Sequence, residues 1–236
     1  MTDDSGGATG PRGIHRIFLG YAPGVGKTYA MLVEARLRAG RGQDVVVGHL
    51  GSRLRPDTQA LAQGLESVSP LKFEYHGSEF SELATEAIIA RHPQWVLVDE
   101  LAHTNVPGAR HEKRWESVDE ILDAGIGVLS TINVQHIESL ADYVYQVSGV
   151  HVVETVPDAI LEAAEVIIID ADPEEVLARV KRGAVVAPEQ VGQALTHFFR
   201  KTTLAALRER TLAMSAFGPR STTAPRSRTR RGHHLS

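Results

Sequence analysis

Short, almost continuously apolar segments alternate with segments of helical periodicity along most of the chain. The apolar segments predict strands at 16–21, 45–50, 95–99, 128–133 and 166–170, and weaker patterns predict short strands near Phe73 and Val152. Strands of a parallel sheet that is covered by helices on both faces meet no water, so they lack polar alternation. The pattern therefore indicates βαβ units and a mainly parallel β-sheet.

Amphipathic segments separate these strands. They predict helices at 27–39, 57–65, 79–91, 112–124, 135–147, 173–182 and 188–210. Strands and helices together indicate the α/β class, with a three-layer arrangement in which helices flank the sheet. A chain of 236 residues is long enough to bury such a core without disulfides or structural metals.

The alternation is confined to residues 14–212, which we predict to form one domain. Residues 1–13 are small or polar and predict a disordered leader, and residues 213–236 are rich in Arg, Ser and Pro and predict a disordered basic tail.

Composition excludes several classes of function. The chain has no cysteine, so disulfide scaffolds, cysteine-ligated metals and cysteine nucleophiles are excluded. No apolar run approaches the roughly 20 residues that cross a bilayer, and the acidic start of the chain lacks the features of a secretory signal. We therefore expect a cytoplasmic chain without a transmembrane segment. The net charge of -4 makes nucleic acid an unexpected partner.

The first predicted strand runs into Gly-Tyr-Ala-Pro-Gly-Val-Gly-Lys-Thr at 20–28, and a helical pattern follows at once. Such a P-loop, or Walker A motif, turns backbone N–H groups and a helix N-terminus toward a polyphosphate. We expect Lys27 to reach the β- and γ-phosphates and Thr28 to bind Mg²⁺. The expected nucleotide-binding residues here are Pro23, Gly24, Val25, Gly26, Lys27, Thr28 and Tyr29. The predicted fold is accordingly P-loop NTPase-like.

One position departs from the strict P-loop pattern, which has glycine where this chain has Tyr21. The alternative interpretation is a glycine-rich turn that only packs.

A second apolar strand ends in Asp99 and Glu100, as in a Walker B segment. Ligands of open α/β sheets bind at the carboxyl ends of the strands. We therefore predict that Asp99 holds Mg²⁺ and that Glu100 is a catalytic residue that orients or deprotonates a water molecule. Without the P-loop, these two carboxylates would be read as exposed residues that end a strand.

Polar residues also follow the strand at 128–133. Thr131, Asn133 or Gln135 would sense the γ-phosphate, and Asn133 is the predicted nucleotide contact among them. Asn133 also suits the N-cap of the next helix, and the two roles are compatible.

The loop at 101–115 is rich in histidines and cations. Arg110, Lys113 and Arg114 are candidates to contact phosphate or an acidic partner. His103 and His111 have no recognised metal-ligand spacing. We expect most of these side chains to be solvated.

Several longer stretches, taken together, resemble the N-terminal cytoplasmic domain of KdpD-type potassium- and osmosensing histidine kinases. They are Phe18–Met31, Val98–Asn105, Pro107–Trp115, Thr131–Leu140, Glu154–Asp158 and Ala194–Glu209. The resemblance covers about residues 14–210 and is far more specific than a P-loop alone.

The resemblance implies an ATP-binding regulatory domain of a two-component system, with ATP and Mg²⁺ as ligands and a protein partner. Family members continue into a universal-stress-like domain, transmembrane helices that anchor them in the inner membrane, and a kinase core. Here the resemblance ends near Arg210. Three interpretations are compatible with this: a truncated copy, a frame-disrupted copy and a free-standing domain. Where the family shows Glu-Thr-His-Gly-Arg, this chain has Gly51-Ser52-Arg53-Leu54-Arg55, so an acidic group and a histidine are missing.

Two rival functions remain beside the regulatory one. A free-standing P-loop ATPase or small-molecule phosphotransferase would use the same Lys27, Thr28, Asp99 and Glu100. The basic tail at 213–236 would otherwise anchor a nucleotide switch to nucleic acid or another acidic surface.

Overall fold

A computed structural model describes residues 10–52, 54–214 and 221–223. Within these residues, strands that all pair in parallel form one seven-stranded sheet in the order β3-β2-β6-β7-β1-β8-β9. Their bounds are β1 His15–Gly20, β2 Val45–His49, β3 Glu66–Ser67, β6 Trp95–Val98, β7 Gly127–Asn133, β8 Glu165–Ile169 and β9 Ser221–Thr223. The expected α/β class and mainly parallel sheet are thus confirmed.

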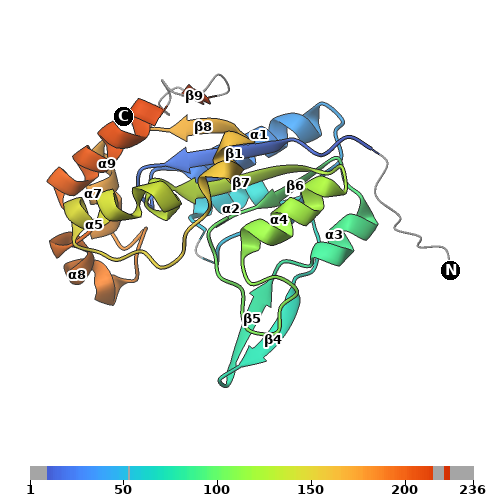
Figure 1. Ribbon diagram of the computed structural model, residues 1–236, viewed down its shortest axis with the longest axis horizontal. Helices are drawn as coiled ribbons and strands as arrows, with labels where there is room; N and C mark the ends of the chain where they lie inside the picture. Colours follow the sequence, from blue (N-terminus) through green and yellow to red (C-terminus); the bar gives the residue numbers. More distant parts are fainter. Residues whose placement is uncertain (1–9, 53, 215–220, 224–236) are drawn as a thin grey trace, which may run out of the picture.

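Helices cover both faces of this sheet, which gives the predicted three-layer, P-loop NTPase-like arrangement (Figure 1). The helices are α1 Lys27–Gly40, α2 Pro56–Ala62, α3 Thr85–Arg91, α4 Arg114–Asp123, α5 Ala141–Ser148, α6 Asp158–Glu162, α7 Pro173–Lys181, α8 Val191–Thr196 and α9 Lys201–Met214. Helices α5, α7, α8 and α9 gather at one end of the molecule (Figure 1). No helix among the described residues is both long enough and apolar enough to span a membrane.

The central strands are buried because both faces of the sheet are covered. Every residue of β6 is buried, and in β7 only Asn133 at its end is less than buried. Their apolar side chains pack against α1 on one face and α4 on the other. This core fixes the carboxyl ends of β1, β6 and β7 relative to one another.

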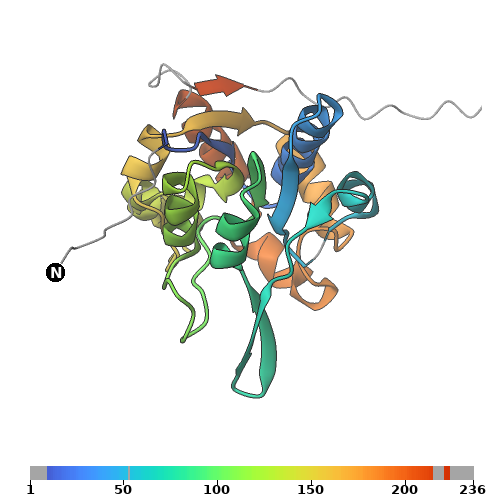
Figure 2. The same ribbon diagram turned by 90° about the vertical axis from the view of Figure 1, so that its right-hand side faces the viewer.

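A β-hairpin, β4 Leu71–Tyr75 and β5 Ser78–Glu82, projects from the body of the domain (Figure 2). Our prediction of a helix over 79–91 was therefore wrong for its first half, and α3 begins at Thr85. The turn explains the difference: His76 and Gly77 both adopt positive φ, at 49° and 74°, as a two-residue hairpin turn requires.

Two other predicted helices include segments that form 3₁₀ turns instead. Residues 134–136 and 138–140 form two 3₁₀ turns, and Ile137 between them forms a parallel bridge with Val156. The N–H of Val156 also bonds to the carbonyl oxygen of His136, which takes that group from any helix. The helix expected over 188–210 is split: a 3₁₀ turn at Pro188–Gln190 leads into α8, and α8 and α9 are separated at 197–200, where Phe199 turns inward and is buried.

Three smaller differences concern element bounds and termini. The segment around Val152 is not a strand, and α4 begins at Arg114, two residues later than expected. The N–H of Gly13, in the expected leader, bonds to the carbonyl of Leu122. Most of the expected leader and tail, residues 1–9, 215–220 and 224–236, lies outside the described residues.

Candidate functional site

Strand order brings three chain segments to one point at the carboxyl edge of the sheet. β7 lies between β1 and β6, with Asn133 opposite Gly20 and Ser130 opposite Val98. The residue that follows Val98 therefore comes next to Thr131. Residues distant in sequence meet here because parallel strands end together.

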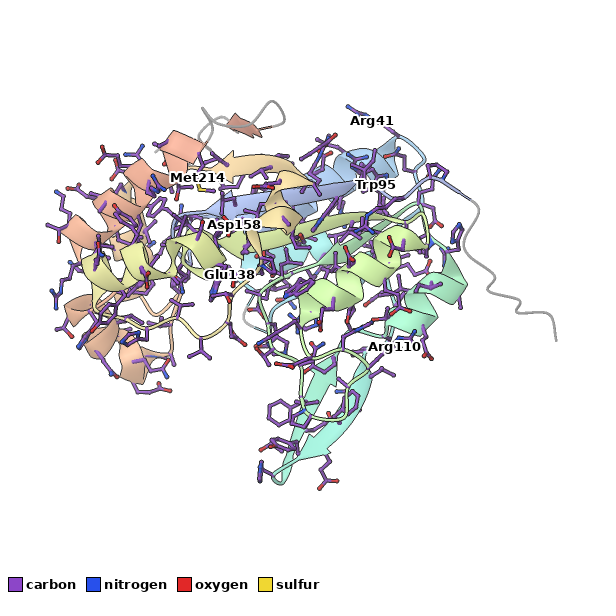
Figure 3. The ribbon with its side chains drawn as sticks, in the orientation of Figure 1. Arg41, Trp95, Arg110, Glu138, Asp158 and Met214 are labelled. Carbon is purple, nitrogen blue, oxygen red and sulfur yellow. The ribbon has the colours of Figure 1, made fainter. Side chains whose placement is uncertain are left out.

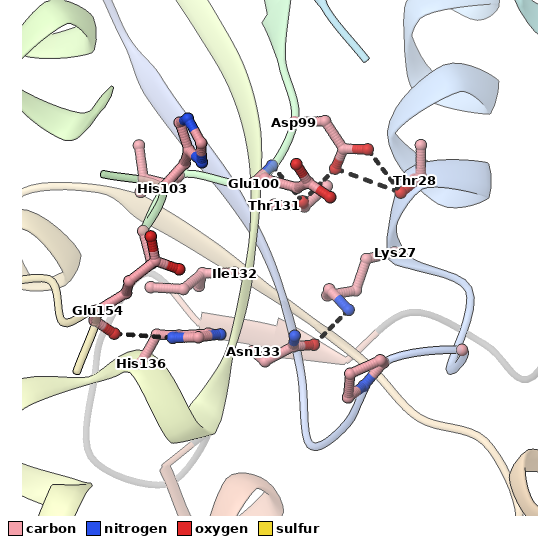
Figure 4. Close-up of a pocket in the computed structure, with 14 residues that line it drawn as sticks. Lys27, Thr28, Asp99, Glu100, His103, Thr131, Ile132, Asn133, His136 and Glu154 are labelled. Carbon is pink, nitrogen blue, oxygen red and sulfur yellow. Dashed lines mark hydrogen bonds between the residues drawn. The ribbon is translucent and has the colours of Figure 1, made fainter. Parts of the chain in front are cut away.

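A cavity of about 340 Å³ opens at this point (Figure 4). It is lined by Pro23, Gly24, Lys27, Thr28, Asp99, Glu100, Leu101, Ala102, His103, Thr131, Ile132, Asn133, His136 and Glu154. The structure thus brings together seven predicted site residues, from Pro23 in the first loop to Asn133 at the end of β7.

The glycine-rich loop, residues 20–26, forms one wall of the cavity and leads into α1. Gly24 and Gly26 have φ of 86° and 111°, backbone torsions that residues other than glycine rarely adopt. Lys27 starts the helix and points its Nζ into the cavity, 2.5 Å from Asn133 Oδ1 and 3.4 Å from the carbonyl oxygen of Ala22. Burial lowers the pKa of Lys27 to about 8, against the opposing effect of nearby carboxylates.

Asp99 stands across from the start of α1. Its carboxylate accepts hydrogen bonds from the hydroxyl of Thr28, at 3.0 and 3.2 Å, and from the hydroxyl of Thr131. The backbone N–H of Gly51 lies 3.4 Å from the same carboxylate. The Asp99 carboxylate and the Thr28 hydroxyl are both hard oxygen ligands. Such a pair suits Mg²⁺, which takes few protein ligands and is otherwise bound by water and phosphate oxygens.

Glu100 follows with a backbone torsion that is uncommon for its residue type, φ 57°. Its N–H donates to the hydroxyl of Thr131 at 3.2 Å, and its carbonyl accepts from Arg114 at 3.3 Å. Its carboxylate lies at the open rim of the cavity. Partial desolvation within the cavity and the charge of Asp99 raise the pKa of Glu100.

Arg114 lies behind this wall and is 1% exposed, so our expectation of a solvated side chain was wrong. Its guanidinium donates to the carbonyl of Asp99 at 3.1 Å and pairs with Glu82 at 3.4 Å. Burial lowers the pKa of Arg114. Glu82 ends the projecting hairpin, and sequence reasoning missed it because it falls inside the segment read as a helix.

The residues after β6 are held by further contacts that no motif indicated. The N–H of Thr104 donates to Glu154 Oε1 at 2.8 Å. His136 Nδ1 lies 2.7 Å from the carbonyl oxygen of Glu154, and its pKa is lowered by burial. From the sequence, Glu154 was identified only within a stretch that resembles the KdpD-type family.

Several predicted residues lie outside the cavity lining. Val25 is buried, Gly26 caps α1, and Tyr29 is half-buried in its first turn. Tyr21 is buried, and its hydroxyl donates to the carbonyl of Ala171 at 3.1 Å, so this departure from the glycine pattern packs against the body of the domain.

The cationic residues at the far end of the loop also point elsewhere. Arg110, labelled in Figure 3, pairs with Glu86 and Glu120, and His111 contacts Glu120 as well. Lys113 donates to the hydroxyl of Thr104. Gln135 does not line the cavity.

Residues 11–217 match the family model described as the osmosensitive K⁺ channel His kinase sensor domain. The chain belongs to the KdpD sensor-domain family. It is 51% identical over 202 residues to the sensor protein KdpD of Mycobacterium tuberculosis, which covers 85% of this chain and 24% of that protein.

Two further relatives carry the same name. The sensor protein KdpD of Escherichia coli is 46% identical over 207 residues, 87% of this chain and 23% of that protein. That of Clostridium acetobutylicum is 44% identical over 206 residues, with the same two shares of 87% and 23%. The chain thus spans about a quarter of the length of these relatives.

Proposed function

We propose that this KdpD-type sensor domain binds Mg·ATP in the cavity and acts as a nucleotide-responsive regulatory module in potassium or osmotic signalling. The observation that carries the proposal is the meeting of Lys27, Thr28 and Asp99 at one cavity, with the Thr28 hydroxyl 3.0 Å from the Asp99 carboxylate. The buried amine of Lys27 would suit a phosphate, and the neighbouring oxygens of Thr28 and Asp99 would suit Mg²⁺.

Each of these groups has a role that its position supports. Lys27 would leave Asn133 and bind phosphate oxygens as an ammonium group, and the N-terminus of α1 would add its positive dipole end. Thr28 and Asp99 would hold Mg²⁺, which neutralises phosphate charge when bound. Asn133 would then be free to contact the terminal phosphate. A histidine kinase to be regulated is the proposed protein partner.

A second candidate function is hydrolysis or phosphate transfer by this domain itself. It is favoured by Glu100, which stands at the rim of the cavity with a raised pKa beside Asp99. In hydrolysis Glu100 would accept a proton from water, the water oxygen would bond to the γ-phosphorus, and the bond from that phosphorus to the ADP oxygen would break. This role would make the chain a slow ATPase.

Calorimetry with Mg·ATP, Mg·ADP and Mg·GTP tests the proposal on three proteins: the unchanged chain, Lys27→Ala, and Lys72→Ala. Lys72 is an exposed lysine on the hairpin and serves as the matched control. We expect Lys27→Ala to weaken Mg·ATP binding by about 100-fold or more, since it removes a charge-assisted phosphate contact. Lys72→Ala should bind as the unchanged chain does.

Phosphate release on the same samples separates the two functions. Tight, Lys27-dependent binding with negligible release supports the regulatory role. Rapid phosphate release that is lost in Glu100→Gln would favour the enzymatic function over the regulatory one. Equal binding by all three proteins would overturn nucleotide binding at this cavity.

A further inference from the structure

The projecting hairpin is anchored to the cavity wall through one buried carboxylate. Glu82, the last residue of β5, is 2% exposed. It lies 3.1 Å from His103 Nε2, and it accepts the backbone N–H of Val106 at 3.0 Å and Arg114 at 3.4 Å. Burial alone would raise the pKa of Glu82, but these three partners together hold it below its usual value.

Arg114 connects this carboxylate to the two acidic residues of the cavity. Its Nη1 donates to the carbonyls of Asp99 and Glu100, at 3.1 and 3.3 Å, and lies 3.7 Å from the Glu100 carboxylate. The contacts fall on the two peptide groups whose orientation sets the φ of 57° at Glu100. Nη2 of the same guanidinium pairs with Glu82 at 3.4 Å. Lysine lacks this fork, since it has no second nitrogen that would bond Glu82 while the first bonds the carbonyls.

A buried ion pair of this kind is a poor source of net stability, because desolvation offsets most of the attraction. In some proteins such pairs fix one geometry out of several. Here the pair would fix the segment that carries Asp99 and Glu100 at the edge of the cavity. The hydroxyl groups of Thr28 and Thr131 also bond to this segment.

We propose that Arg114 and Glu82 form a positioning pair that fixes the Asp99-Glu100 segment for Mg²⁺-dependent nucleotide binding and couples the β4–β5 hairpin to the cavity. The part of this statement that concerns nucleotide binding rests on the proposed function. The pair touches no ligand itself: Arg114 acts through the backbone of Asp99 and Glu100, and Glu82 acts through Arg114.

Amide hydrogen exchange without nucleotide tests the positioning directly. Arg114→Lys and Glu82→Gln keep size and polarity but remove the fork and the charge, and Arg110→Lys is the matched control in the same loop, outside the cavity. We expect faster exchange in peptides that span 99–106 for the first two variants and no change for Arg110→Lys. Unchanged exchange at 99–106 in Arg114→Lys would overturn the proposal, whatever the protein binds.

Nucleotide binding with and without the metal separates positioning from general loss of structure. Arg114→Lys should weaken Mg·ATP binding by about tenfold or more, as loss of a residue that orients a metal ligand does. It should change ATP binding in EDTA by less than about twofold, because the Lys27 side of the cavity is untouched. Equal weakening under both conditions would mean a merely structural role and would overturn the proposal.

The coupling to the hairpin has its own readout. Mg·ATP should slow amide exchange at residues 78–84 in the unchanged chain, but it should not alter that exchange in Arg114→Lys. An equal response in both proteins would overturn the coupling. Failure of the proposed function looks different: the unchanged chain and Lys27→Ala would then show the same response to Mg·ATP, while the exchange at 99–106 without nucleotide still decides whether the pair positions the segment.

Discussion

The two walls of the cavity are built in different ways. The glycine-rich loop and the start of α1 come from one run of nine residues, 20–28, whose shape depends on backbone torsions at Gly24 and Gly26. The wall after β6 depends on partners far away in sequence, above all Glu82 and Thr131. The first wall is therefore encoded locally, whereas the second exists only once the hairpin and β7 are in place.

This difference decides how each wall should fail. A local wall is damaged by a side chain that its torsions do not allow. A wall assembled from buried polar groups is damaged when one partner is removed and the other stays buried without it.

The largest effect is expected at the assembled wall. Arg114→Met leaves Glu82 buried beside an apolar side chain, and breaking a buried pair in this way costs about 3–5 kcal/mol of unfolding free energy. Urea denaturation measures it. The double variant with Glu82→Gln should recover part of the loss, because the charge that lost its Arg114 partner is then removed as well.

A loss below about 1 kcal/mol in Arg114→Met would contradict this prediction, since it would mean that Glu82 is easily rehydrated. The position of the wall would then depend on the hydroxyl of Thr131 rather than on the ion pair.

The next effect concerns the local wall, where two glycines differ in their surroundings. A Cβ at Gly24 would lie 2.5 Å from a methyl carbon of Val185, while a Cβ at Gly26 would meet nothing within 4 Å. We expect Gly26→Ala to cost about 1–2 kcal/mol from backbone strain alone and Gly24→Ala about 1 kcal/mol more. Thermal or urea unfolding checks the difference.

Val185→Ala supplies the control, because it removes the methyl groups that the new Cβ would meet. Combined with Gly24→Ala it should bring the cost close to that of Gly26→Ala, and a strictly additive result would show that the close approach is irrelevant.

Much of the first wall was predictable, because spacing and residue type within one short run suffice to place Lys27 and Thr28. The adjacent carboxylates Asp99 and Glu100 were found for the same reason, at the end of an apolar strand. Glu82 could not be found, because nothing local separates a buried hairpin carboxylate from a residue on a helix surface. The signal that was available, a glycine at position 77 between two alternating segments, indicates a hairpin turn but not what the hairpin anchors.

Fold errors have the same origin. The parallel sheet was predictable from continuous apolar runs, but a spacing of three at Val134, Ile137 and Leu140 resembles a helix until Val156 is seen to bond across it. Arg114 was misjudged because sequence reports its charge and not the carbonyl groups that surround it.

A smaller effect at the local wall follows from the pKa of Lys27, about 8. Above this pH the folded protein holds the neutral amine, which attracts phosphate weakly, so Mg·ATP affinity should fall by up to about tenfold per pH unit. The stability of the nucleotide-free protein should change in the opposite sense. Between about 8 and the usual value of 10.5 the unfolded chain binds more protons, so unfolding free energy from this group rises with pH.

Calorimetry and urea denaturation across this range measure both trends. Lys27→Arg keeps its charge throughout, so its affinity should not fall above pH 8. A parallel fall in that variant would assign the pH dependence to another group.

The smallest expected effect belongs to a peripheral contact of the assembled wall. Asn105 is buried, and its Nδ2 donates to the carbonyl of His111 at 3.0 Å, but its Oδ1 has no partner among the described residues. Asn105→Ala removes one hydrogen bond and one unmatched acceptor together, so it should cost only about 0.5–1 kcal/mol in urea denaturation. His111→Ala keeps the backbone carbonyl and should leave this cost unchanged in the double variant. A cost above about 2 kcal/mol would mean that the wall depends on Asn105 as strongly as on a buried charge, and the contrast between peripheral and central contacts would disappear.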